Sequence, residues 1–175
     1  MKIRLAGPLT FDSIVDGPGL RMVVWTQGCP HQCSGCHNPQ THDLSGGFEM
    51  STEIIITQMK NSRLQKGITL SGGEPFWQAK ALLPIAKAAK AIGFDVWSYT
   101  GFRFEELLNE NKVGYQDRIA LLQNVDVLVD GRFVERLKSH DLLFRGSSNQ
   151  RIIDVQQSLA TGQVVLCEQY MERIQ

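Results

Sequence analysis

The chain lacks any excess of charge of one sign, because 18 Lys and Arg residues balance 18 Asp and Glu residues. A formal net charge of +0 gives no general attraction to nucleic acid, so the sequence predicts no nucleic-acid partner. The chain also lacks an uncharged run of the about 18 residues that a transmembrane helix needs, and we expect no membrane partner. Residues 1–8 are interrupted too early for a signal peptide, which predicts a cytoplasmic protein.

The length predicts a single domain over residues 1–175. A chain of this size buries roughly 70% of the surface that it exposes when unfolded, so its core needs no metal or disulfide. A metal bound to this chain is therefore expected to be functional.

Cysteine is scarce, with four residues in the whole chain, and three of them lie close together as Cys29, Cys33 and Cys36. This clustering excludes a disulfide framework and is typical of a metal or catalytic site. The fourth, Cys167, ends an apolar run that begins at Val164. We expect Cys167 to be a buried core thiol, because free cysteine packs like a small hydrophobic residue.

Short apolar, β-branched segments alternate with helical patterns along the chain. Strands are expected at residues 20–26, 67–71, 94–99 and 125–130. Helices are expected at residues 52–60, 78–92, 104–109 and 116–123. This alternation is typical of βα units and predicts an α/β fold with a parallel sheet.

Polar or glycine-rich segments follow the four expected strands. They are the cysteine loop, the Gly-Gly-Glu-Pro turn at 72–75, and the segments 99–101 and 130–132. In parallel β/α folds, ligands bind where the C-terminal ends of the strands converge. We therefore expect all four segments to face one site.

Three thiolates on a tight loop can hold a metal and leave one coordination position open. His31 or His37 could complete a zinc site, in which case the chain is a zinc-stabilised binding module. A 4Fe-4S cluster usually has four cysteine ligands, so three would leave one iron open to substrate. The spacing favours the cluster, because zinc sites typically use short paired cysteine knuckles.

The Cys-x-x-x-Cys-x-x-Cys pattern after the first expected strand closely resembles the radical S-adenosylmethionine (SAM) superfamily. Flanking motifs resemble the glycyl-radical-enzyme activases of that superfamily, at residues 16–21, 36–38 and 71–75. Within this group, the short length and residues 145–151 are most similar to the activating proteins of anaerobic ribonucleoside-triphosphate reductase.

The resemblance implies a radical SAM oxidoreductase with a 4Fe-4S cluster held by Cys29, Cys33 and Cys36. SAM would chelate the open iron and be cleaved with an electron from a reduced flavodoxin-type donor. The resulting 5′-deoxyadenosyl radical would form a glycyl radical on the large subunit of the anaerobic reductase. Beyond cluster and SAM, no catalytic side chain is implied.

The resemblance also implies SAM contacts at six residues. They are Gly72, Gly73 and Glu74 near the amino group, Thr100 and Asp130 near the ribose or a cation, and His37 near adenine. Each has an alternative interpretation: the first three as a strand-to-helix turn, Thr100 and Asp130 as capping groups, and His37 as a solvated loop residue. Gly35 and Tyr99 depart from the pattern of many relatives, which have an aromatic and an acidic residue there.

Two other activities share the same superfamily, activation of pyruvate formate-lyase and radical chemistry on small molecules. The short length argues against both. A closed β/α barrel typically needs about 250 residues. We therefore expect a partial, open β/α barrel of the radical SAM type, with room for a partner's glycine loop.

Overall fold

The computed structural model describes residues 1–172, and its nine strands form one mixed sheet. The four central strands are parallel and buried, and they lie close to the segments that the sequence predicts. They are β3 (Arg21–Thr26), β5 (Gly67–Gly72), β6 (Asp95–Tyr99) and β7 (Val127–Asp130). The α/β prediction is confirmed at the centre of the molecule.

The strands flanking this centre pair antiparallel, and the sequence analysis did not predict them. They are β1 (Lys2–Leu5), β2 (Thr10–Ser13), β4 (Phe48–Ser51), β8 (Arg151–Asp154) and β9 (Val165–Leu166). The main path runs β4-β1-β3-β5-β6-β7-β8-β9, with β2 paired to β3. Within residues 1–172, no pairing joins β4 to β9, so the sheet is open, as expected for a partial barrel.

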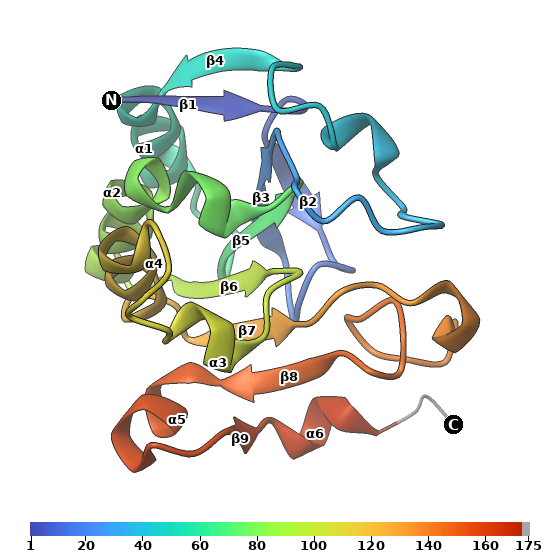
Figure 1. Cartoon of the computed structure of the whole chain (residues 1–175). Helices are drawn as coiled ribbons and strands as arrows, with labels where there is room; N and C mark the ends of the chain where they lie inside the picture. Colours follow the sequence, from blue (N-terminus) through green and yellow to red (C-terminus); the bar gives the residue numbers. More distant parts are fainter. Residues whose placement is uncertain (173–175) are drawn as a thin grey trace.

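Three helices cover one side of the parallel strands (Figure 1). They are α1 (Thr52–Asn61), α2 (Ala79–Ala91) and α4 (Tyr115–Leu122). The Ser51 hydroxyl caps α1 by accepting the Glu53 amide, and a short 3-10 turn (Pro75–Gln78) leads into α2. The main core lies between these helices and the sheet.

Shorter helices lie around the ends of the sheet. They are α3 (Phe104–Leu107), α5 (Val155–Thr161) and α6 (Glu168–Met171), with 3-10 turns at Pro39–Thr41 and Glu135–Leu137. The helix α3 ends two residues before the predicted Asn109. At its N-terminus, the Arg103 amide donates a hydrogen bond to Glu106 Oε2 at 2.7 Å.

A second, smaller apolar cluster lies under β6, β7 and β8. Its buried members are Trp97, Val129, Ile152 and Cys167. Trp97 also contacts the rings of Phe144 and Tyr170 edge-on, at centroid distances of 5.5 and 5.4 Å. The expectation that Cys167 is a buried core thiol is therefore confirmed.

Candidate active site

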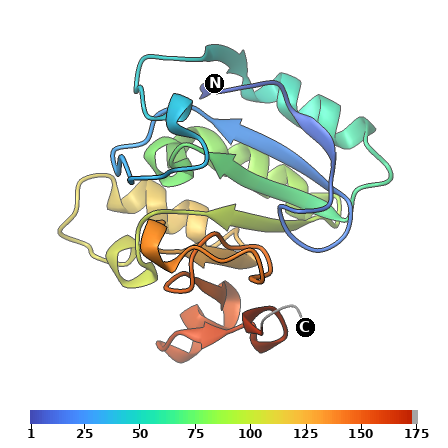
Figure 2. The same cartoon turned by 90° about the vertical axis from the view of Figure 1, so that its right-hand side faces the viewer.

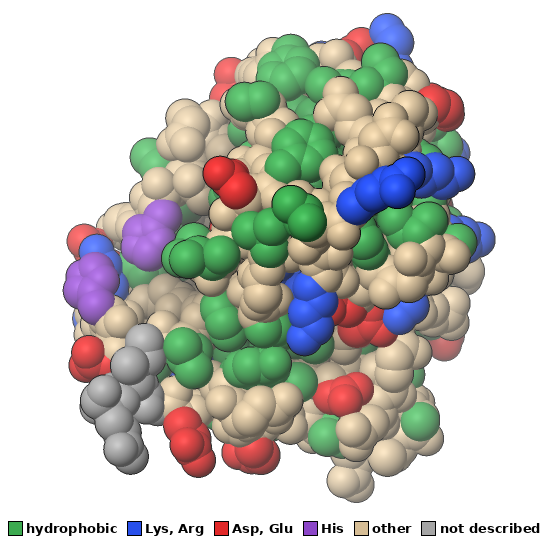
Figure 3. Space-filling view, turned by 180° about the vertical axis from the view of Figure 1, so that it is seen from behind, with side chains coloured by type: hydrophobic (Ala, Val, Ile, Leu, Met, Phe, Trp, Pro, Cys, Tyr) green, Lys and Arg blue, Asp and Glu red, His purple; other side chains and the backbone are tan. Residues whose placement is uncertain are grey.

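A cavity of about 410 Å³ opens at the C-terminal ends of the parallel strands. It is lined by residues of the cysteine loop, the Gly-Gly turn, residues 99–101 and Gly131, so all four predicted segments meet there. Figure 2 shows the blue cysteine loop and the orange loop around residue 140 at the same end of the sheet. From behind, hydrophobic side chains gather in the middle of the face (Figure 3).

All three clustered thiols, Cys29, Cys33 and Cys36, line this cavity. Burial raises the pKa of the Cys29 and Cys33 thiols, so each is protonated until a metal displaces the proton. Backbone amides oppose that shift. Those of His31 and Gln32 donate to Cys29, and that of Phe133 donates to Cys33.

These amide-to-sulfur bonds fit an iron–sulfur cluster, whose potential depends on hydrogen bonds to its cysteine sulfurs. The Asn38 amide completes the set by donating to Cys36 Sγ at 3.4 Å. Each of the three sulfurs thus has at least one backbone donor.

The base of the cysteine loop is closed by the chain's own backbone. The Gly28 amide donates to the Thr41 carbonyl at 2.9 Å, and the Cys29 amide donates to the His42 carbonyl at 3.4 Å. The Glu74 amide donates to the Gly28 carbonyl at 2.8 Å. The loop is therefore anchored both to itself and to the turn after β5.

Gly72 and Gly73 line the cavity, and the fold requires both to be glycine. Gly72 has φ +98°, and a Cβ there would lie 2.5 Å from the Thr26 carbonyl oxygen. A Cβ on Gly73 would lie 2.5 Å from the Gly28 carbonyl oxygen. Their small size thus serves the packing of β5 on β3 and also leaves the cavity wall bare.

Glu74 is fully buried behind the cavity wall, where it joins three segments. Its Oε1 accepts from the Phe76 amide (3.0 Å) and the Thr100 hydroxyl (2.8 Å). Its Oε2 accepts from the Gly101 amide (2.8 Å) and pairs with His31 Nε2 (2.8 Å). Glu74 is thus not among the cavity-lining residues, and its carboxyl group instead holds residues that do line the cavity.

Thr100 lines the cavity, and its buried hydroxyl donates to Glu74 and accepts from the Phe102 amide at 3.1 Å. His31 also lines the cavity, and its side chain is only 4% exposed. Because its Nε2 is bonded to Glu74, this nitrogen of His31 is not available as a metal ligand. Within residues 1–172, no three or more His, Cys, Asp or Glu side chains are grouped so that they could hold one metal ion.

Asp130 does not reach the cavity, and the structure places it in its alternative role as a capping group. Its Oδ2 accepts from the Phe104 amide at 2.8 Å, at the start of α3. Its Oδ1 accepts from Arg151 Nε at 3.0 Å, and Arg151 also bonds Glu105. A ribose or cation contact is not favoured by this arrangement.

His37 lines the cavity from an exposed position and lies against Phe133, with ring centroids 5.1 Å apart. Phe133 was not anticipated as an aromatic wall, although it follows the fourth predicted strand by three residues. Gly35 has φ +69°, a left-handed conformation that residues with a side chain rarely adopt. His37 and Phe133 together supply the aromatic surface beside Cys36.

Several other lining residues were missed because they come from separate parts of the chain. They are Asp16, Trp25, Leu142, Phe144 and Gln150. Asp16 lies in the Asp-Gly-Pro-Gly motif, which was the available signal. The Tyr99 hydroxyl donates a hydrogen bond to the Phe144 carbonyl at 2.8 Å. Tyr99 thus helps to close one wall of the cavity.

Cys167 lies outside this site, and burial raises its pKa to about 11. We expect Cys167→Ala to leave the iron content unchanged and to cost about 1 kcal/mol of stability, because one buried sulfur is lost. At pH 8 the wild-type thiol should also react much more slowly with iodoacetamide than the cysteines of the apo loop. Loss of iron in Cys167→Ala would show that this thiol supports the cluster.

Comparison with known families shows that the chain with this thiol-lined cavity is an iron–sulfur protein. The family described as "4Fe-4S single cluster domain" matches residues 15–153. The chain is 37% identical over 147 residues to the anaerobic ribonucleoside-triphosphate reductase-activating protein of Vibrio cholerae, which covers 79% of this chain and 90% of that protein. The proteins of that name from Escherichia coli K12 and Enterobacteria phage T4 are 36% and 34% identical. The chain belongs to the family of anaerobic ribonucleoside-triphosphate reductase-activating proteins.

This membership confirms the resemblance that the cysteine spacing and its flanking motifs predict. It also shows that the alternative of a zinc-stabilised binding module is wrong, because the chain matches an iron–sulfur domain. Among solved structures, QueE from Escherichia coli matches with a TM-score of 0.45 and 16% identity, over 57% of this chain and 53% of that one. No helix within residues 1–172 is both long and apolar enough to cross a lipid bilayer.

Proposed function

We propose that this chain activates anaerobic ribonucleoside-triphosphate reductase by forming a glycyl radical on its large subunit. One electron and one SAM molecule would give methionine and a 5′-deoxyadenosyl radical. That radical would take a hydrogen atom from a glycine Cα, leaving 5′-deoxyadenosine and the glycyl radical. The observation that carries the proposal is that three thiols with amide donors share one cavity with a bare Gly-Gly turn.

Cys29, Cys33 and Cys36 are the proposed ligands of the cluster. When bound, a reduced 4Fe-4S cluster supplies the electron that cleaves SAM. The amides of His31, Gln32, Phe133 and Asn38 would donate to the ligand sulfurs and so tune the potential. The chain's own contribution is to fix these donors on a closed loop.

The part of the cavity that the cysteines do not line is the proposed SAM site. Its volume of about 410 Å³ lies within the range usual for small-molecule sites. Gly72 and Gly73 allow the ligand to approach the backbone, and His37 with Phe133 offers an aromatic face for adenine. Thr100 and Glu74 are proposed to hold the cavity wall in place rather than to react.

The partner's glycine is proposed to enter through the open side of the sheet. Val15, a cavity-lining residue, is 72% exposed, so apolar surface is available at the rim for a partner loop. Covering this rim would exclude water and protect the radical from quenching. We also propose that residues 1–175 act as one radical SAM domain in the cytoplasm, with a reduced flavodoxin-type protein as electron donor.

Electron paramagnetic resonance tests this function directly. Anaerobically reconstituted chain, dithionite and SAM are mixed with the large subunit of the anaerobic reductase, with pyruvate formate-lyase as the matched control. The expected result is a glycyl radical signal on the reductase alone, together with 5′-deoxyadenosine and methionine in equal amounts. A signal only on pyruvate formate-lyase would contradict the proposed partner, and no SAM cleavage with either would contradict the activity.

A further inference from the structure

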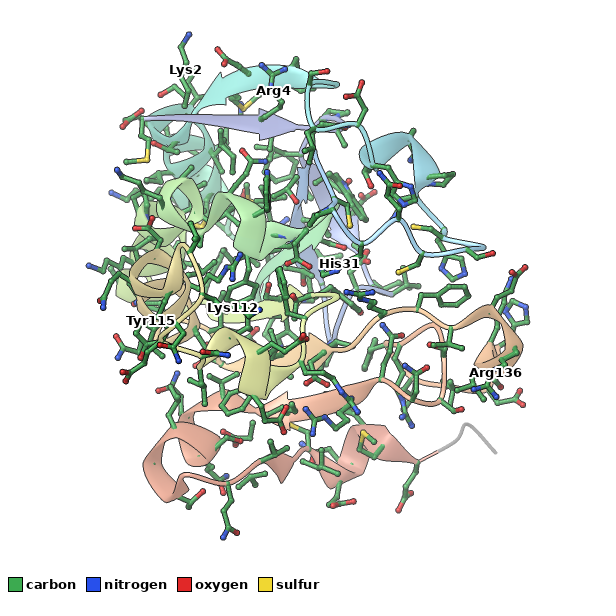
Figure 4. All side chains as sticks on the ribbon, in the orientation of Figure 1. Lys2, Arg4, His31, Lys112, Tyr115 and Arg136 are labelled. Carbon is green, nitrogen blue, oxygen red and sulfur yellow. The ribbon has the colours of Figure 1, made fainter. Side chains whose placement is uncertain are left out.

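A second hollow, of about 440 Å³, borders the cysteine loop but contains none of its thiols. Pro30 and His31 line it from the loop, and His31 lines the first cavity as well. Figure 4 labels two of its residues, His31 on the cysteine loop and Lys112 on the segment between α3 and α4. The hollow therefore offers a separate approach to the loop that carries the cluster ligands.

Positive charge is concentrated in this hollow, although the chain as a whole is neutral. Lys112, Arg118 and Arg132 line it, against one carboxylate, Glu106, which is engaged by the Arg103 amide. Within residues 1–172, none of these three cations forms an ion pair. An acidic surface would complete this set of charges.

Apolar surface accompanies the cations. Trp77 is 49% exposed and Val113 is 94% exposed at the same hollow. The Arg118 guanidinium lies over the Phe102 ring, 4.6 Å from its centroid, so it is held in place before any partner arrives. Exposed Trp beside Arg is the composition that protein interfaces favour at their centres.

The floor of the hollow is rigidly connected to the cluster ligands. His31 stands two residues from both Cys29 and Cys33, and its ring meets Phe102 edge-on at 4.6 Å. A Cβ on Gly101 would lie 2.3 Å from the His31 ring, so the ring is packed directly against the backbone. A redox group seated here would lie beside the loop that carries the proposed cluster ligands, and electron transfer needs such proximity.

From these observations we propose that the hollow docks an acidic electron-carrier protein that reduces the cluster. The proposal rests on the proposed function, in which SAM and a glycine loop occupy the first cavity and leave the electron to enter elsewhere. The carrier loses one electron and the cluster gains it, and no bond is formed. Acidic side chains around the carrier's redox group would pair with Lys112, Arg118 and Arg132.

The test compares two reductants on the cluster-loaded chain. In Lys112→Glu/Arg118→Glu, we expect the rate of cluster reduction by reduced flavodoxin to fall about 10- to 100-fold at low salt. Reduction by dithionite should keep its wild-type rate and extent, since it needs no docking surface. A charge-matched control, Lys80→Glu/Lys87→Glu, reverses two exposed lysines of α2 and should match the wild type with both reductants.

A second variant separates docking from folding. Trp77→Ala removes exposed apolar area without changing charge, and it should slow only the flavodoxin reaction, at all salt concentrations. Wild-type rates with flavodoxin in both variants would overturn the proposal. A wild-type chain that accepts electrons from flavodoxin yet forms no glycyl radical would instead contradict the proposed function, because docking is read from cluster reduction alone.

Discussion

Replacing Cys33 with alanine is expected to abolish cluster binding and all glycyl radical formation while the chain stays folded. Two cysteines cannot hold a cluster that already lacks a fourth protein ligand. Cys33 is half-buried in a loop and belongs to neither apolar cluster, so the apo variant should lose no more than about 1 kcal/mol of stability. Iron analysis, the absorption of the reconstituted protein and the radical signal measure the effect.

Ser34→Ala is the matched control, since Ser34 lies on the same loop and bonds only the exposed Glu135 side chain, at 3.2 Å. It should keep full iron content and radical yield. A Cys33→Ala chain that still binds a four-iron cluster would show that another residue supplies a ligand. The same results are expected for Cys29→Ala and Cys36→Ala.

Replacing Glu74 with alanine is expected to lower the free energy of unfolding by about 3–5 kcal/mol, because buried donors lose their acceptor. The four donors are the Phe76 amide, the Thr100 hydroxyl, the Gly101 amide and His31. For a chain of this length, the melting temperature should fall by roughly 10 °C or more. Radical formation should fall as well, since the carboxyl group links the cysteine loop to the cavity wall.

Glu74→Gln keeps the volume of the side chain and sharpens this test. Either orientation of the amide turns its NH₂ group toward two donors. We therefore expect a free energy of unfolding between that of the wild type and that of Glu74→Ala. Glu110→Ala, at an exposed position, should leave the melting temperature unchanged. Wild-type stability in both Glu74 variants would show that the buried network contributes little.

The centre of the fold could be predicted because its strands are continuous apolar runs. β3 and β5 can be identified from their own residues, without knowing which strands they pair with. The flanking strands could not be predicted in this way, since β9 has only two residues and is defined by its pairing with β8. Short edge strands depend on tertiary pairing more than on their own sequence.

The candidate site was predictable where spacing alone carries the chemistry, as for the three cysteines and the two glycines. It was less predictable where a side chain can turn either way at the end of a strand. Asp130 turns toward α3 because Arg151, on a strand that was not predicted, lies beside it. Glu74 likewise turns away from the cavity because buried donors surround it on the other side.

The closed base of the cysteine loop also bears on how the cofactor is installed and repaired. Closing a loop of this length costs conformational entropy, and the backbone bonds at Gly28 and Cys29 offset part of that cost. These bonds fix the base of the loop and so restrict the space in which its three thiols can move. We therefore expect the chain to stay folded when its cluster is lost, so that a new cluster can be inserted without unfolding the protein.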